Sequence, residues 1–395
     1  MTQSVVLDEV VDGLTVIAAQ LPYARSCVGV LSVPTGYADD PPGREGTAHL
    51  TEHICVVTAP HRDRVQMGAR TEATATRYSA RTTPSSTATL LAALTSPFDP
   101  KICPAALHES ETRAVLTENA RVRDQPQLQV ASAVAALAAP TLDVAFRDTT
   151  TEHSIAAVTP DDVVAFRQRR YRPTGSVLCL VGPGDPDELL AQAHAAAAVL
   201  PGGREPVHPG PARGPAEPCQ SEGWKDCFLW STLTPPADGD DDQFARRLAV
   251  ELLVGTGGLL DESGTAVGSR STGYATLPGR HTDLHVVAWP AGAHTATLAA
   301  ELTERAADRL ESTGRAAVAG ARARLRSRIA FDQQSPGGLA AMLVRHALGQ
   351  GPWPAIADID LVDDRRVIEL ADRMLHAATV WQIADGRLGT VSASR

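Results

Sequence analysis

A stretch rich in proline and glycine divides the 395-residue chain into two parts of similar length. Ten of the 18 residues from 201 to 218 are Pro or Gly, and neither a helix nor a central strand continues through such a composition. At about 100 to 200 residues per domain, each part has the length of one domain. We therefore predict a first domain over residues 1–200, a linker over residues 201–218 and a second domain over residues 219–395.

Short sequence echoes indicate that the two parts are related. Thr-Ala-Thr-Leu occurs at 87–90 and again at 295–298, and Gly-Thr-Ala-His-Leu at 46–50 resembles Gly-Thr-Gly-Gly-Leu at 255–259. The two offsets, 208 and 209 residues, are nearly equal, which is typical of an internal duplication.

Both parts mix strand-like and helix-like segments. Short runs rich in β-branched residues predict strands, and apolar residues spaced three or four apart predict helices. We therefore expect an α+β fold made of two similar, duplicated α+β domains, each a mainly antiparallel sheet packed with helices. The predicted strands are 14–19, 28–33, 177–181 and 284–289, and the predicted helices are 48–56, 105–123, 160–170, 242–254 and 293–310.

Charge and cysteine usage exclude several classes of function. The formal net charge of −10 disfavours nucleic acid and anionic membranes as partners. The six cysteines include no C-x-x-C pair, so we expect reduced structural thiols. Residues 1–9 lack the features of a signal peptide, and no run of about 18 apolar residues occurs, so we predict a cytoplasmic protein.

One segment predicts chemistry: Gly46 to His53 contains the pattern H-x-x-E-H. On a helix, His49 and His53 are four residues apart and Glu52 is three from His49, so all three side chains lie on one face. Two neutral imidazoles are common zinc ligands, and a carboxylate beside them accepts a proton from an activated water. The alternative is two histidines and a solvated glutamate with no role in metal binding.

A zinc site of this kind needs a third protein ligand, and the best source is the segment 108–119. Glu111 and Glu118 are seven residues apart, so on a helix they share a face and are separated by about 10 Å along the axis. Because both cannot easily bind one ion, one is a candidate ligand and the other a candidate hydrogen-bond partner for a ligand. The alternative is a solvated pair of glutamates.

Together these motifs resemble the pitrilysin, insulysin and mitochondrial processing peptidase family of inverzincins, which are zinc endopeptidases built from duplicated α+β domains. The resemblance extends over most of the first part of the chain and continues loosely to the C-terminus. It rests on residues 13–16, Gly36, the run 46–53, the pair Glu111 and Glu118, the segment 159–166, Tyr171, Pro173 and the strand that ends at Gly182.

The resemblance implies a zinc endopeptidase and assigns the candidate residues. His49, His53 and Glu118 would bind Zn²⁺, and Glu111 would support them. Glu52 would act as the general base that accepts a proton from the attacking water and delivers it to the leaving amine. No covalent enzyme intermediate is needed.

The second part of the chain departs from the family pattern. Gly258 and Asp261 stand where the first part has His49 and Glu52, so we expect no second zinc site. The family's Arg and Tyr that hold the substrate backbone correspond here to Asp261 and Val267. Arg270 and Tyr274 nearby are candidates for shifted substitutes. In the first part, Glu72 stands where the family usually has the Asn of its substrate-binding edge strand.

A catalytic part without that Arg and Tyr is similar to one subunit of a heterodimeric family member. We therefore expect a partner subunit of the same family to supply both residues. The expected substrate is an extended peptide that pairs with a sheet edge, and removal of part of a precursor peptide is the specific hypothesis, with general peptide turnover beside it. The alternative function is a non-catalytic assembly or structural subunit of the same fold.

Overall fold

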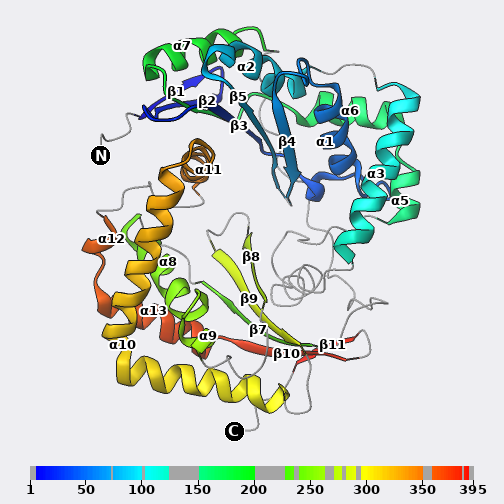
Figure 1. Ribbon diagram of the computed structural model, residues 1–395. Coiled ribbons are helices and arrows are strands. Elements are labelled where there is room, and N and C mark those ends of the chain that lie inside the picture. The colour runs from blue at the N-terminus through cyan, green and yellow to red at the C-terminus, as the bar shows by residue number, and fades with distance from the viewer. Residues whose placement is uncertain are drawn as a thin grey trace. The chain divides into compact units, whose positions relative to one another are not determined.

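The chain forms two units in the computed structural model (Figure 1). Unit 1 comprises Met1–Asn119, Asp148–Pro211 and Phe331–Pro354, and unit 2 comprises Ala120–Arg147, Ala212–Ala330 and Ala355–Arg395. The structure describes residues 6–72, 74–99, 103–123, 151–200, 227–234, 240–262, 271–277, 282–290, 295–349, 358–384 and 387–390.

Unit 1 is built on a six-stranded sheet in the order β1-β2-β6-β3-β5-β4. All neighbouring strands are antiparallel except β2 and β6, which are parallel. The strand β4 therefore forms one edge of the sheet. The strands are β1 (Val6–Val11), β2 (Leu14–Gln20), β3 (Cys27–Val33), β4 (Gln66–Thr71), β5 (Thr76–Thr82) and β6 (Val177–Gly182).

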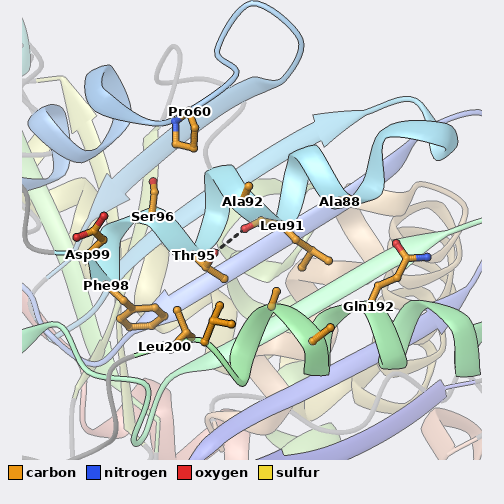
Figure 2. Close-up of a pocket in the computed structure, with 13 residues that line it drawn as sticks. Pro60, Ala88, Leu91, Ala92, Thr95, Ser96, Phe98, Asp99, Gln192 and Leu200 are labelled. Carbon is orange, nitrogen blue, oxygen red and sulfur yellow. Dashed lines mark hydrogen bonds between the residues drawn. The ribbon is translucent and has the colours of Figure 1, made fainter.

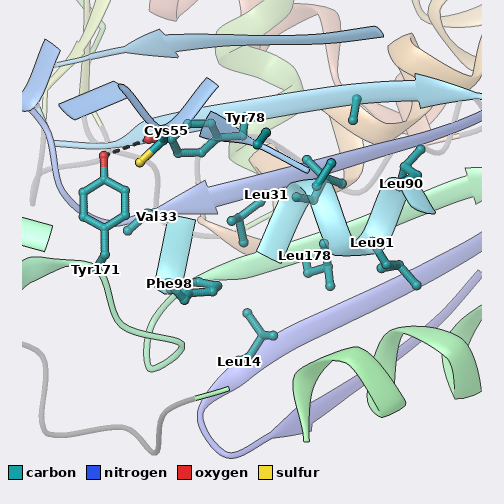
Figure 3. Close-up of a cluster of buried hydrophobic side chains, with 14 of the residues drawn as sticks. Leu14, Leu31, Val33, Cys55, Tyr78, Leu90, Leu91, Phe98, Tyr171 and Leu178 are labelled. Carbon is teal, nitrogen blue, oxygen red and sulfur yellow. Dashed lines mark hydrogen bonds between the residues drawn. The ribbon is translucent and has the colours of Figure 1, made fainter. Parts of the chain in front are cut away.

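Helices α1, α2 and α7 cover one face of this sheet. The central strands of the sheet are buried throughout, and their apolar side chains meet those of the helices in one core cluster (Figure 3). Helix α2 lies so close to β3 that a Cβ on Gly29 would clash with a methyl carbon of Leu94. The helices of unit 1 are α1 (Thr47–Thr58), α2 (Thr87–Thr95), α3 (Ala105–Arg123), α5 (Glu152–Ala156), α6 (Pro160–Arg170), α7 (Pro186–Ala197) and α11 (Pro336–Ala347), with short 3₁₀ turns at Tyr37–Asp39, Pro84–Ser86 and Ser96–Phe98.

The opposite face of the sheet is covered by α11, which comes from far along the sequence. Leu339, Ala340, Leu343 and Val344 of this helix pack against apolar side chains of β2, β3 and β6. The sequence analysis placed residues 219–395 in the second domain, whereas Phe331–Pro354 packs within unit 1. The predicted linker at 201–218 lies outside the described residues.

Unit 2 has a five-stranded antiparallel sheet in the order β11-β10-β7-β9-β8. Its core contains the fully buried Trp230 and Trp289, and α8 packs against α13. The elements are β7 (Cys227–Leu233), β8 (Ser271–Leu277), β9 (Thr282–Pro290), β10 (Thr379–Ala384), β11 (Arg387–Thr390), α8 (Asp240–Val254), α9 (Leu259–Glu262), α10 (Thr295–Gln333), α12 (Asp358–Leu361) and α13 (Asp364–His376).

The two units share a strand arrangement. The order β6-β3-β5-β4 in unit 1 corresponds to β10-β7-β9-β8 in unit 2. The repeated Thr-Ala-Thr-Leu opens α2 after β5 and opens α10 after β9. The predicted fold class, two similar α+β domains with mainly antiparallel sheets, is therefore confirmed.

The predicted secondary structure is confirmed for the named segments, although α1 and α8 are two or three residues longer than predicted and α10 differs more. Each predicted strand lies within β2, β3, β6 or β9, and α3 and α6 have the predicted ends. Helix α10, predicted to end at 310, continues to Gln333. No helix within the described ranges combines the length and the apolar character needed to cross a membrane.

A groove of about 820 Å³ lies between α2 and α7 on the outer side of unit 1 (Figure 2). Its walls are mainly apolar, with Leu91 and Phe98 on one side and Val199 and Leu200 on the other. None of the candidate metal-binding residues lines it.

Candidate metal centre

Helix α1, which carries the H-x-x-E-H pattern, has a firmly held N-terminus. Gly46 precedes the helix with a φ of 101°, in the left-handed region that favours glycine. The two carboxylate oxygens of Asp40 accept hydrogen bonds from the backbone N–H groups of Gly46 and Ala48, each at 2.7 Å. This carboxylate satisfies backbone donors that an α-helix leaves free at its start.

The apolar side of α1 packs against α3 and so positions both helices. Leu50 and Ile54 are fully buried in a cluster that includes Val115 of α3. Residues four before and three after Val115 share its side of α3, and these are Glu111 and Glu118. Packing at Val115 therefore turns both glutamates toward α1.

His49 and His53 lie side by side on α1, with ring centroids 4.9 Å apart. Their side chains are 15% and 17% exposed, so each ring has one side in protein and one open to solvent. Glu118 Oε2 lies 3.8 Å from His49 Nε2 and 3.4 Å from His53 Nε2. Ligand atoms of these three residues all lie within 4.8 Å of one another, and no other such group occurs among the residues that the structure describes.

Glu111 contacts the other nitrogen of His53. Its Oε2 lies 3.2 Å from His53 Nδ1, and its side chain is 15% exposed. An ionised carboxylate only accepts, so the Nδ1–H donates to Glu111 and the lone pair of Nε2 points to the group formed with Glu118. The structure thus separates the two glutamates: Glu118 is near both Nε2 atoms and Glu111 is behind one ring.

Glu52 is buried, with 6% of its surface exposed, and is held by an edge strand. The hydroxyl of Thr71, the last residue of β4, donates a hydrogen bond of 2.7 Å to Glu52 Oε2. The next residue, Glu72, turns to Arg77 instead, with a guanidinium nitrogen 3.3 Å from its Oε1. Glu52 is therefore paired with Thr71 and Glu72 with Arg77, so the carboxylate beside the histidines is that of Glu52.

A buried polar layer supports α1 from below. Tyr78 and Tyr171 join their hydroxyls by a hydrogen bond of 2.9 Å, and Cys55 of α1 lies beside them (Figure 3). Burial raises the pKa of both tyrosines and of Cys55. Arg167 donates to the carbonyl oxygens of Ser96, Pro97 and Asp99. The two hydroxyls and the thiol therefore stay protonated and neutral. They support α1 by packing and hydrogen bonding and do not exchange protons with the site.

The cysteines do not provide an alternative catalytic centre in the described residues. Five of the six lie in described segments, and all five are buried. Burial raises the pKa of the thiols of Cys27, Cys103 and Cys179 as it does for Cys55, so they stay protonated and unreactive near neutral pH.

The donor set fits zinc. Two imidazoles and one carboxylate, with ligand atoms this close together, are the ligand types that catalytic zinc sites use. Glu111 adds the hydrogen bond that orients a ligating imidazole. Glu118 is 55% exposed, so solvent reaches the same point.

The candidate substrate-holding residues of the second part are only partly described. Val267 and Arg270 lie outside the described residues, Asp261 is in α9 and Tyr274 is on β8, where its backbone pairs with His285. The structure therefore leaves the suggested substitution by Arg270 and Tyr274 a prediction.

Sequence reasoning missed two residues of this site, Asp40 and Thr71. Asp40 lies six residues before Gly46, the residue that precedes the helix, which is beyond the local spacing of a capping motif. Thr71 is one of many threonines, and only the placement of β4 beside α1 brings its hydroxyl to Glu52.

Comparison with solved structures relates this two-unit arrangement to known proteins. A protein described as an M16-like peptidase from Alicyclobacillus acidocaldarius has a TM-score of 0.73 and 17% sequence identity, with 96% of this chain and 98% of that one covered. A protease from Helicobacter pylori has a TM-score of 0.75 and 15% identity, with 98% and 99% covered. The chain has the fold of M16-like peptidases.

Two further comparisons show how much of a longer protein, and how much of this chain, the M16-like similarity covers. The periplasmic protease PqqL from Escherichia coli has a TM-score of 0.71 and 14% identity, and the match covers 96% of this chain but 47% of that one. The family model described as "Peptidase M16 inactive domain" matches residues 157–277. No curated protein matches the sequence.

Proposed function

We propose that this chain is a zinc-dependent endopeptidase of the pitrilysin, insulysin and mitochondrial processing peptidase kind. The observation that carries the proposal is the convergence of His49, His53 and Glu118 from two helices, with their ligand atoms within 4.8 Å. The M16-like fold supports it. In this proposal the three residues bind Zn²⁺.

The residues around the ion have separate tasks. Zinc held there supplies Lewis-acid polarisation of a peptide carbonyl and makes a water more acidic. Glu52 accepts a proton from the attacking water and delivers it to the leaving amine. Thr71 holds the Glu52 carboxylate by one oxygen and leaves the other for the water. Glu111 holds His53 with Nε2 toward the metal.

The substrate in this proposal is an extended peptide, and a partner subunit completes the enzyme. The edge strand β4 ends at Thr71, beside Glu52, so a peptide paired with β4 passes the catalytic carboxylate. The family's Arg and Tyr are replaced by Asp261 and Val267, so a related subunit is expected to supply them. Removal of part of a precursor peptide in the cytoplasm remains the specific hypothesis.

The test is metal content and hydrolysis measured on the same dialysed preparations. We expect about one zinc per wild-type chain, loss of zinc in Glu118→Ala, and loss of both zinc and hydrolysis in His53→Ala. Glu52→Gln keeps zinc and lowers hydrolysis of a peptide library by about 10³-fold. Retained turnover in Glu52→Gln would exclude the general-base role.

One observation favours a second candidate, a non-catalytic assembly subunit. The matched family model is described as an inactive domain. However, its residues 157–277 include none of the five site residues, which lie between 49 and 118. Absence of bound metal after zinc loading would favour this second candidate.

A further inference from the structure

Three arginines lie on one face of the β4–β5 hairpin, and we call Arg70, Arg77 and Arg81 the arginine strip. Side chains alternate between the two faces of a sheet. On β5, the buried residues alternate with the arginines: Tyr78 and Ala80 pack into the core cluster under α1 and α2, whereas Arg77, Ser79 and Arg81 point to the other face. Register pairs Arg70 of β4 with Arg77, so it shares that face.

The positive charge of the strip is only partly neutralised. Glu72 Oε1 lies 3.3 Å from Arg77 and 3.9 Å from Arg70, so one carboxylate serves two guanidinium groups. Among the described residues, no carboxylate lies within 4.0 Å of the exposed Arg81 guanidinium. Arg81 therefore carries a positive charge with no described carboxylate beside it, in a chain whose formal charge is −10.

The space between the ends of the strip is open. Gly68 pairs with Ser79 there, and a Cβ on Gly68 would meet only the Ser79 hydroxyl, at 3.9 Å. The side chain of a neighbouring strand therefore has room over Gly68. Arg70 and Arg77 flank this space at one end and Arg81 at the other.

The strip borders the sheet edge that leads to the candidate metal centre. Among the strands that the structure describes, β4 has a neighbour on one side only, so its outer backbone groups can pair with an added strand. A strand added there places every second side chain on the face of the strip. At about 5 Å between strands, Arg81 lies roughly 10 Å from the added strand, a gap that an arginine and a glutamate side chain span together.

We propose that β4 binds an extended peptide with acidic side chains at alternate positions, which contact the arginine strip. If such peptides are substrates, this rests on the proposed peptidase function: acidic peptides would then be the substrates of the candidate metal centre. Charge complementarity selects this occupant, because neutral peptides gain only the backbone pairing and basic peptides are repelled. Small or apolar residues suit the intervening positions, which face the side of Met67 and Ala69.

The experiment measures binding to the full chain carrying Glu52→Gln, which prevents turnover. Four labelled decapeptides share one Thr/Val host sequence and carry Glu, Gln or Lys at three alternate positions, or Glu at three consecutive positions. We expect the alternating Glu peptide to bind about tenfold more tightly than the Gln peptide, since two to three exposed ion pairs contribute that much. The consecutive Glu peptide binds more weakly than the alternating one, although its charge is identical.

Matched variants assign the preference to the strip. Arg70→Gln with Arg81→Gln is expected to reduce the Glu peptide to the affinity of the Gln peptide, and Lys at both positions is expected to keep most of the preference. The control is Arg113→Gln with Arg169→Gln, two exposed arginines on α3 and α6. It removes the same charge and should leave the preference unchanged. Melting curves of all variants show whether they are folded.

The outcomes separate this proposal from the proposed function. Equal binding of the four peptides, equal loss in the control, or equal binding of an oligonucleotide of the same charge would overturn the strip proposal. Hydrolysis of all four peptides by wild type with equal kcat/KM would overturn it while keeping the peptidase. Selective binding without hydrolysis by wild type would keep the strip and overturn the peptidase.

Discussion

Both units place carboxylates against long helices, but the partners of those carboxylates differ. In unit 1, Glu111 and Glu118 face two histidines. In unit 2, the buried Glu251 lies 3.1 Å from Arg324 and 2.7 Å from Arg328. A neutral imidazole keeps a lone pair for a metal, whereas an arginine stays protonated and offers only donors. A glutamate carboxylate therefore lies beside groups that can bind a metal in unit 1, and it is part of an ion-pair cluster in unit 2.

The largest expected effect tests the structural role of the carboxylate in unit 2. Glu251→Ala leaves two arginines without their shared partner, and we expect the free energy of unfolding to fall by about 3 kcal/mol. Zinc content should not change. Differential scanning calorimetry and metal analysis of the same preparation check this.

The control for that variant is an exposed ion pair on α10, the helix that carries Arg324 and Arg328. Arg305 and Glu301 are 3.0 Å apart with side chains 58% and 45% exposed. Glu301→Ala should cost less than about 0.5 kcal/mol. A similar cost for Glu251→Ala would show that the unit 2 cluster does not hold the fold together.

The next effect tests the carboxylate of unit 1. Glu111→Gln removes the charge that orients His53, and we expect zinc affinity to fall by about 10- to 100-fold. The stability of the metal-free protein should change little by comparison. Competition with a chromogenic chelator measures the affinity, with Glu109→Gln, exposed on the same helix, as the control. Unchanged zinc affinity in Glu111→Gln would show that this carboxylate does not support a metal ligand, and the contrast drawn between the two units would fail.

The smallest effect concerns Thr71 in unit 1. It holds a carboxylate by a neutral hydroxyl, whereas the carboxylate of Glu251 in unit 2 is held by arginines. Thr71→Val keeps the shape of the side chain and removes the hydrogen bond to Glu52. A hydrogen bond to a charged group contributes about 1.5–3 kcal/mol, so we expect kcat to fall about tenfold or more. Thr71→Ser should restore most of it, and zinc content should be equal in all three proteins. A fall in KM alone, with kcat unchanged, would contradict a role in positioning Glu52.

The sequence was a good guide where the information is local. The ends of α3 and α6 were predicted because their apolar spacing lies within the helix itself. The face shared by His49, Glu52 and His53 follows from helical spacing alone. These local patterns required no knowledge of the rest of the chain.

Residues that meet through tertiary packing were out of reach. Periodicity could not choose between Glu111 and Glu118, because their difference arises from the position of α3 against α1 at Val115. The length of α10 was underestimated because Gly314 and Gly320 look like helix ends, yet both lie inside the helix. Thr71 depends on β4 lying beside α1, which no short pattern encodes.

The placement of α11 on the sheet of unit 1 has a consequence for synthesis of the chain. Until residue 347 has left the ribosome, the apolar side chains of β2, β3 and β6 on that face have no helix to cover them. A fragment that stops after residue 200 therefore exposes an apolar sheet surface. Nascent chains with such a surface aggregate or bind chaperones. Separate expression of residues 1–200 should thus give insoluble protein unless the segment 331–354 is supplied with it.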